Sequence, residues 1–94
     1  MKITGLIWLE DVVEKLLQKH QVQQQEVKEV LAKLPRFFFV EKGHRRGENV
    51  YAALGQTDAG RYLIVFFVHT RDGRALVLSG RDMTDSERKR YERK

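Results

Sequence analysis

The chain has 94 residues, a formal net charge of +5 and no Cys. This length supports one domain with a modest core, and the lack of Cys excludes disulfides, thiolate catalysis and cysteine-rich zinc sites. The positive charge favours RNA, DNA or an acidic protein as the partner. We therefore expect a single domain over residues 1–94. Acidic residues interrupt the apolar N-terminal stretch, as they would not in a signal peptide, so we expect a cytoplasmic protein.

The first half of the chain predicts one short strand followed by two helices. Residues 1–8 carry β-branched and aromatic side chains and predict a strand broken near Gly5. Apolar residues then recur at the spacing of one helical face over residues 9–20 and again over residues 23–34. Pro35 ends the second helix because proline cannot continue the helical hydrogen bonding. Both helices are amphipathic, so we expect each to cover a sheet.

The second half predicts four strands. Residues 37–40 are a continuous apolar run, which indicates an interior strand, and the polar loop 41–48 follows. Residues 49–56 read as the next strand. Residues 62–68 are seven consecutive apolar residues, too few to span a membrane, and predict a central strand buried on both faces. The partner strand starts at Ala75. Because the apolar run is too short to span a membrane, we expect no membrane contact.

A hairpin joins the last two strands. Asp72-Gly73 between two β runs is the strongest short hairpin signal, because a type I′ turn needs positive φ at both central positions. A two-residue loop would pair Arg71 with Arg74. The same register would place Arg71 and Arg81 on opposite faces of the sheet.

A short helix closes the chain. Thr84 followed three residues later by Glu87 fits a capping box, so the helix should start near Asp85. The predicted order is β-α-α-β-β-β-β-α. Sequential strands with short turns indicate an α+β fold with an antiparallel sheet, the two amphipathic helices on one face and the C-terminal helix near the other face or an edge.

Basic residues gather in two parts of the sequence. The group in the final third consists of Arg71, Arg74, Arg81, Arg88, Lys89, Arg90, Arg93 and Lys94, and the group in the polar loop consists of Lys42, His44, Arg45 and Arg46. The planar fork of arginine matches phosphate oxygens, and tyrosines such as Tyr51 and Tyr91 can stack on bases. A solvated helix, or an arm that orders against an acidic partner, explains the C-terminal charges equally well.

Individual candidates each have a structural alternative. Arg81 leaves the end of a predicted strand beside a glycine, which suits a functional role, or else it forms an ion pair with Asp82 or Asp85. His69 and His20 could act as a general base, or could be a packed core residue and a helix-end residue, respectively. The sequence contains no nucleotide-binding, metalloprotease or serine-hydrolase motif, and we expect no metal and no cofactor.

Several segments together resemble the BrnT toxins of bacterial type II toxin–antitoxin systems. They are Trp8 with Lys19-His20-x-Val22, then NVYAALGQTDAGRYLIVFFVHTRDG, then LVLSGRDMTDSERKRYE. The most specific parts are A-L-G-x-T-x-x-G-R at residues 53–61, and Ser79-x-Arg81 with the following E-R-x-x-Y-E at residues 87–92. Gly80 departs from the alanine that is common in the second motif.

The resemblance implies a RelE-like fold and a ribonuclease that inhibits translation and is neutralised by a partner antitoxin. It implies catalytic roles for Arg71, Arg81, Arg88 and Tyr91. The residues expected to contact RNA are Lys19, His20, Arg46, Tyr51 and Lys89. The resemblance leaves two oligomeric states possible, a homodimer and a heterotetramer with the antitoxin.

Metal-free RNA cleavage activates the ribose 2′-hydroxyl against the adjacent phosphorus, and arginines can stabilise the extra negative charge that develops there. In this hypothesis Arg81 and Arg71 bind the phosphate, Arg88 and Tyr91 orient it, and the base is one of the two histidines or another group. Two alternatives stand beside it. One is a non-catalytic interaction module for an acidic partner, and the other is a nucleic-acid-binding protein that does not cleave.

Overall fold

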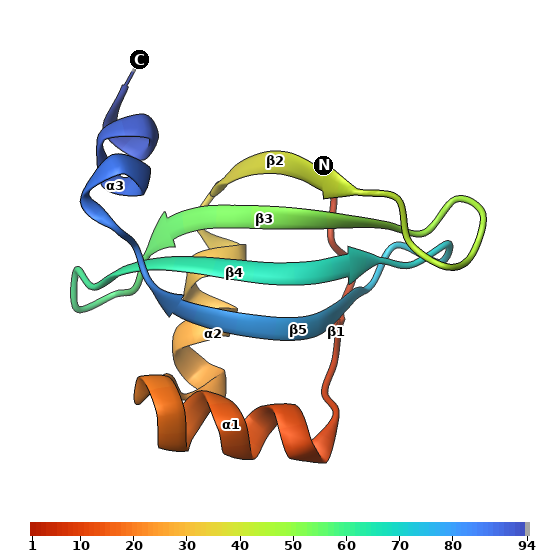
Figure 1. Cartoon of the computed structure of the whole chain (residues 1–94), viewed down its shortest axis with the longest axis horizontal. Coiled ribbons are helices and arrows are strands. Elements are labelled where there is room, and N and C mark those ends of the chain that lie inside the picture. Colours follow the sequence, from red (N-terminus) through yellow and green to blue (C-terminus); the bar gives the residue numbers. More distant parts are fainter. Residues whose placement is uncertain (94) are drawn as a thin grey trace.

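A computed structural model describes residues 1–93 as a five-stranded sheet with three helices (Figure 1). The elements are β1 (Leu6–Ile7), α1 (Glu10–His20), α2 (Gln24–Ala32), β2 (Arg36–Glu41), β3 (Asn49–Gln56), β4 (Tyr62–His69), β5 (Ala75–Asp82) and α3 (Asp85–Glu92). The predicted order and the α+β class are confirmed. Lys94, one of the basic residues considered above, lies outside the described residues. No helix within residues 1–93 is long and apolar enough to cross a membrane.

The sheet has the strand order β1-β5-β4-β3-β2 and is antiparallel except at β1. Leu6 and Ile7 of β1 pair in parallel with Ala75 and Leu76 of β5. The expectation of a wholly antiparallel sheet is therefore wrong at this edge. The first strand pairs with the last one across the intervening chain, and such a distant partner leaves no local signal in the sequence.

The two N-terminal helices cover one face of the sheet, as predicted. α1 buries Val12 and Leu16, and α2 buries Val27 and Val30, in one core with side chains of β3, β4 and β5. Phe67 of β4 is fully buried at the centre of this core. Each such side chain contributes about 1.5–3 kcal/mol through burial. In Figure 1, α2 lies behind the sheet and α1 runs along its lower side.

The opposite face is only partly covered. Ala52, Leu54 and Ile64 form a second buried cluster beneath Met83 and Tyr91, close to α3. Residues 63–65 of β4 are buried on both faces of the sheet, as predicted for the central strand, but Tyr62, Phe66 and Val68 on the second face are only partly buried. The C-terminal helix lies on this second face at one end, as expected, and the rest of the face is open.

β2 corrects a second expectation. The apolar run of residues 37–40 lies on an edge strand and not on an interior one, and Phe39 and Val40 are 57% and 45% exposed. The run is apolar because both faces of the strand are partly covered. Phe37 packs edge-on against Phe67 on the helical side, and Phe38 lies beneath the Arg90 guanidinium on the other side.

The β4–β5 hairpin has a three-residue loop, not the predicted two-residue turn. Thr70 N–H donates to the Arg74 carbonyl, and Gly73 N–H donates to the Thr70 carbonyl, both at 2.9 Å. Gly73 has a φ of 89°, as this type of loop requires at its third position.

A β-bulge further along restores the predicted register. Phe66 pairs with Ser79 and Ile64 pairs with Arg81, as predicted, whereas Phe67 pairs with Val77. Leu78 is the extra residue. Its insertion turns Val77 into the core under the helices, where the prediction had placed it on the opposite face.

Candidate functional site

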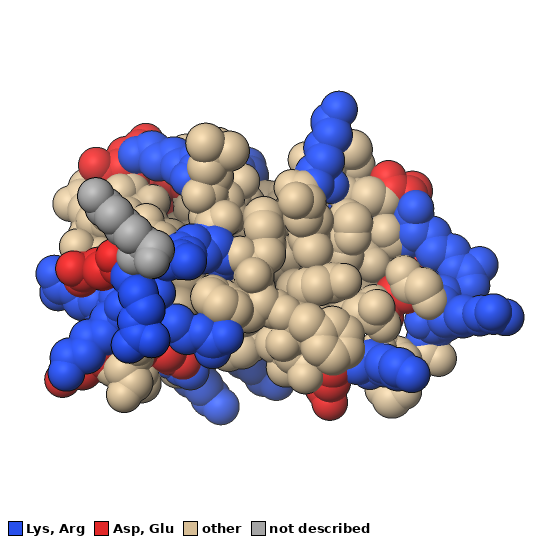
Figure 2. Space-filling model, turned by 90° about the horizontal axis from the view of Figure 1, so that it is seen from above, with Lys and Arg blue, Asp and Glu red and all other residues tan. Residues whose placement is uncertain are grey.

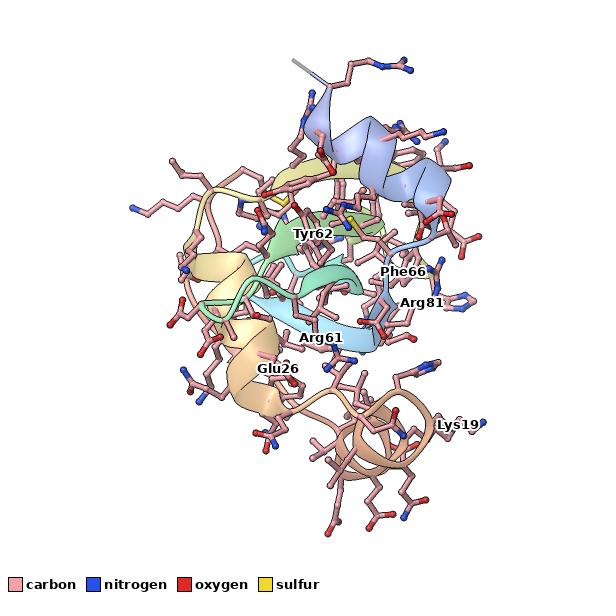
Figure 3. The ribbon with its side chains drawn as sticks, turned by 90° about the vertical axis from the view of Figure 1, so that its left-hand side faces the viewer. Lys19, Glu26, Arg61, Tyr62, Phe66 and Arg81 are labelled. Atoms are coloured by element: carbon pink, nitrogen blue, oxygen red, sulfur yellow. The ribbon has the colours of Figure 1, made fainter. Side chains whose placement is uncertain are left out.

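Arg81 lies on the open face of the sheet, near the end of β5. Its guanidinium is 5.7 Å from the centre of the Phe66 ring on the neighbouring strand (Figure 3). Nη1 and Nη2 donate to the two carboxylate oxygens of Glu87 at 2.7 and 2.9 Å, and Nη1 also donates to the Asp82 carbonyl at 3.1 Å. The ion pair expected with Asp82 or Asp85 is therefore made with Glu87. Among the described residues, these bonds occupy three of the five N–H groups of the guanidinium, so two remain for a ligand.

Glu87 connects Arg81 to the first turn of α3. Its carboxylate accepts a hydrogen bond from Thr84 N–H at 2.8 Å, and its own N–H donates to the Thr84 hydroxyl at 3.2 Å, which confirms the predicted capping box. The guanidinium of Arg81 is the main reason that the pKa of Glu87 is lowered to about 2, and the same bond raises the pKa of Arg81. The end of β5 and the start of α3 are thus held together by one carboxylate.

The next turns of α3 place two more predicted residues beside the same strand. The Arg88 guanidinium lies 3.9 Å from the centre of the Tyr62 ring and donates to Glu92 at 2.8 Å. Tyr91 packs edge-on against Tyr62, with ring centres 6.0 Å apart. Tyr62 and Phe66 lie on one face of β4, because residues four apart in a strand share a face. The structure therefore brings Arg81, Arg88 and Tyr91 to one end of the open face.

Arg36 fixes the far end of α3. Its Nη1 donates to the carbonyls of Arg90 and Tyr91 at 3.2 and 3.0 Å, and also to that of Arg93. These carbonyls lack partners within the helix, so a cation satisfies them. Lys89, predicted to contact RNA, is exposed on the same helix.

The end of α1 lies next to the end of β5. Lys19 and His20 line a small hollow of about 160 Å³ together with Ser79 of β5. Arg61 holds this junction, since it donates to the His20 carbonyl at 2.8 Å and to Asp82 at 2.8 Å. Figure 3 shows the Lys19 and Arg81 side chains on the same side of the molecule. The two residues predicted on α1 thus lie at the Arg81 end.

Arg71 lies at the other end of the sheet. Its Nε donates to the Arg46 carbonyl at 2.8 Å, and its backbone N–H donates to Glu48 at 3.1 Å. From Arg74 to Arg81 the chain advances about 23 Å, at roughly 3.3 Å per strand residue. The structure does not bring Arg71 and Arg81 together. Figure 2 shows the same division, with Lys and Arg gathered at both ends and a largely uncharged band between them.

Two other candidates lie on the helical side of the sheet. Tyr51 stacks on Phe67 with ring centres 6.1 Å apart, and packs against His69. A ring nitrogen of His69 is 3.3 Å from the Lys2 carbonyl. His69 is therefore a packed, hydrogen-bonded residue, which was its structural alternative, and neither side chain faces Arg81.

The sequence reasoning missed three residues that shape the site: Arg61, Tyr62 and Glu87. Arg61 could have been found as the last residue of the A-L-G-x-T-x-x-G-R segment, and Glu87 as the N3 residue of the capping box. Tyr62 carried no signal beyond its place in an apolar run. Within residues 1–93, no group of three or more His, Asp or Glu side chains is arranged to hold a metal ion.

A comparison with known protein families assigns the chain to one of them. A family model described as the ribonuclease toxin BrnT of type II toxin–antitoxin systems matches residues 8–87. The chain belongs to this family. No curated protein matches the chain.

Members of the BrnT family are ribonuclease toxins, so RNA and a cognate antitoxin are the partners that membership implies. The matched residues include Lys19, His20, Arg71, Arg81 and Glu87, and they end just before Arg88. Membership in the BrnT family therefore covers the strand part of the site and the first turn of α3. The roles predicted for Arg88 and Tyr91 depend on the E-R-x-x-Y-E motif and on their geometry, because the match ends before them.

Proposed function

We propose that this BrnT-family chain is a single-domain, RelE-like endoribonuclease over residues 1–94 that cleaves RNA without a metal ion, inhibits translation in the cytoplasm and is neutralised by its antitoxin. The observation that carries the proposal is the grouping of Arg81, Arg88 and Tyr91 on the open end of the sheet in a family of ribonuclease toxins. The toxin would form either a homodimer or a heterotetramer with the antitoxin. The mass of the assembly in solution distinguishes these two states.

The proposed reaction is an internal transesterification. The ribose 2′-oxygen loses its proton and forms a bond to the adjacent phosphorus, while the bond from phosphorus to the 5′-oxygen breaks and that oxygen takes up a proton. The products are a 2′,3′-cyclic phosphate and a 5′-hydroxyl. The phosphorus carries extra negative charge in between, and fixed cationic donors stabilise it. Arg81 supplies two such N–H groups, and Arg88 and Tyr91 orient the RNA.

His20 is the proposed base. An effective base has a pKa near the working pH, which Glu87 does not have because its pKa is lowered to about 2. Of the two histidines considered from the sequence, His20 lines the hollow beside Ser79, whereas His69 is packed on the helical side. Histidine is the side chain that most often serves as a general base in proteins.

The test compares Arg81→Ala with Glu87→Ala. Both variants break the same ion pair, but only the first removes the phosphate donor. Loss of one transition-state donor costs about a hundredfold in rate. We expect Arg81→Ala to lose about that factor in cleavage of RNA by the purified protein, and Glu87→Ala to lose much less.

The products and conditions complete the test. Fragments should carry 2′,3′-cyclic phosphate and 5′-hydroxyl ends, and cleavage should continue in a chelator of divalent metals. Expression without antitoxin should stop protein synthesis, and Arg81→Ala should relieve that arrest. Equal losses in the two variants would assign Arg81 to folding only, and RNA binding without cleavage products would refute the ribonuclease proposal.

A further inference from the structure

Three hollows on the surface join into one track along β5. The first, of about 540 Å³, lies at the hairpin tip and is lined by Arg45, Arg71 and Arg74. The second, of about 390 Å³, lies on the open face beneath the loop between β2 and β3. Arg45, Glu48 and Leu76 line both, so these two hollows adjoin each other.

The third hollow lies between α1 and the edge of β5 and adjoins the second one. Leu78 lines the second hollow and also the third, which contains Lys19, His20 and Ser79. Ser79 is two residues from Arg81 on the same strand. The track therefore runs from the hairpin tip to the Arg81 end, and Figure 1 shows the two loops at one end of the sheet and α3 at the other.

Leu78 is exposed at the middle of this track for an identifiable reason. It is the extra residue of the β5 bulge, and bulges re-aim a side chain at the expense of regular pairing. Its side chain is 39% exposed although it lies within a strand, and Leu76, Val50 and Val68 are its neighbours in the second hollow. The middle of the track is thus an apolar floor.

The charges of the track match a polyanion. Six Lys and Arg residues and three acidic residues line the three hollows. The cations lie mainly at the two ends, and one acidic residue, Asp72, is already paired with Arg74 at 2.9 Å. Grooves for single-stranded nucleic acid combine basic residues that hold phosphates with a surface that contacts base faces. In this track the basic ends match the first feature, and the aliphatic floor would contact bases by apolar packing.

We propose that the β5 track binds single-stranded RNA, with the hairpin tip as a second phosphate anchor remote from the cleavage site. This inference rests on the proposed function, in that RNA is taken as the substrate. It gives Arg71 a role in binding RNA at a distance from the reaction. It also sets a length requirement, because a stacked strand that advances about 3.4 Å per nucleotide covers the 23 Å between the anchors in about seven nucleotides.

The test measures binding without cleavage. The probes are 2′-O-methyl oligoribonucleotides of mixed sequence, from about three to about twelve nucleotides, which lack the attacking hydroxyl. Fluorescence anisotropy should show affinity rising up to about seven nucleotides and little beyond that length. In the double variant Arg71→Gln with Arg74→Gln, the ratio of long-probe to short-probe affinity should fall at least about tenfold. The slope of log affinity against log salt concentration should decrease in magnitude by about 1.4, for two lost phosphate contacts.

Matched controls separate the track from general charge and from folding. Lys28→Gln with Lys33→Gln removes the same charge from α2 and the residue that follows it, outside the track, and should keep the wild-type ratio. Leu78→Asp adds a negative charge to the floor and should lower long-probe affinity, whereas Leu17→Asp, at a leucine 54% exposed on α1, should not. Thermal unfolding of each variant shows whether it is folded.

The outcomes distinguish this inference from the proposed function. Length-dependent binding without any cleavage of natural RNA would refute the ribonuclease proposal and leave the track standing. The track is refuted if the tip variant keeps the wild-type length dependence, or if the α2 control loses as much. It is also refuted if the tip variant binds RNA normally and fails only to bind the antitoxin, because the surface would then serve a protein partner.

Discussion

Arg61 connects the end of α1 to α2 and β5. Its Nη1 donates to the Gln21 carbonyl at 2.7 Å and to Glu26 of α2 at 3.2 Å, and Nε donates to Asp82 of β5 at 2.8 Å. Nη2 donates to the His20 carbonyl at 2.8 Å. The guanidinium thereby satisfies carbonyls at the end of α1 that have no partner within the helix. We predict that Arg61→Ala destabilises the whole protein.

The size of the loss depends on how far each contact is shielded from water. A hydrogen bond that involves a charged group is worth about 1.5–3 kcal/mol when it is shielded from water. The Arg61 and Glu26 side chains are 26% and 23% exposed, whereas Asp82 is 65% exposed, so the Asp82 contact adds little. Partial exposure reduces each of the other three contacts, to Glu26 and to the Gln21 and His20 carbonyls, to about 1 kcal/mol, so the loss is about 3 kcal/mol. For a domain of this size it corresponds to a fall in Tm of about 12–24 °C.

Thermal and urea unfolding monitored by circular dichroism would measure this loss. Arg61→Lys should recover only part of it, because an ammonium group cannot reach a carboxylate and two carbonyls as a planar fork does. Arg74→Ala breaks an exposed ion pair with Asp72 and should change stability by less than about 1 kcal/mol. If Arg61→Ala lowered the Tm no more than Arg74→Ala, the junction would not depend on Arg61.

Three further outcomes follow from individual contacts. Glu87 has a lowered pKa, so its contribution to the free energy of unfolding is complete above its ordinary pKa and is lost as the pH falls toward about 2. The wild type should therefore be more stable than Glu87→Gln by about 1 kcal/mol near neutral pH, after allowance for solvent screening. Urea titrations should show this difference shrink on acidification. Phe67→Ala empties the centre of the core and should cost about 3–5 kcal/mol, seen as a lower urea midpoint without a change in slope. Gly73→Ala forces a side chain onto a φ of 89° and should cost about 1–2 kcal/mol, with faster amide exchange confined to the hairpin.

The elements of the fold were predictable because their signals are local. The helices were found from the recurrence of apolar residues along one face, and the capping box of Thr84 and Glu87 located the start of α3. α2 ends at Ala32, before the predicted end, and Leu34 next to Pro35 has a φ of 44°. The residue before a proline avoids the helical region, so the sequence marked the break but not its first residue.

Features that depend on distant partners were not predictable. The parallel pairing of β1 joins the two ends of the chain, and the edge position of β2 depends on which strands find each other. The three-residue loop and the bulge at Leu78 are linked for a similar reason. The loop shifts the register by one residue near the turn and places Ala75 and Val77 on the core face of the sheet. If this register continued along β5, Ser79 and Arg81 would also face the core, and the bulge reverses the shift before Gly80 pairs with Val65. The cost of burying a charged side chain in the core therefore requires the second irregularity once the first is present.

The separation of Arg71 from Arg81 follows from the same hairpin. An arginine next to a turn and an arginine at the far end of the returning strand lie at opposite ends of the sheet, whatever the register. The turn residues Asp72 and Gly73 were recognised from the sequence, so this distance was already implicit in the prediction that assigned both arginines to one phosphate. Two cations about 23 Å apart cannot stabilise the same oxyanion, since charge stabilisation needs direct hydrogen bonding at about 3 Å. They can hold the same strand of RNA at different phosphates, and the apolar floor around Leu78 is the surface that such a strand would cross between them.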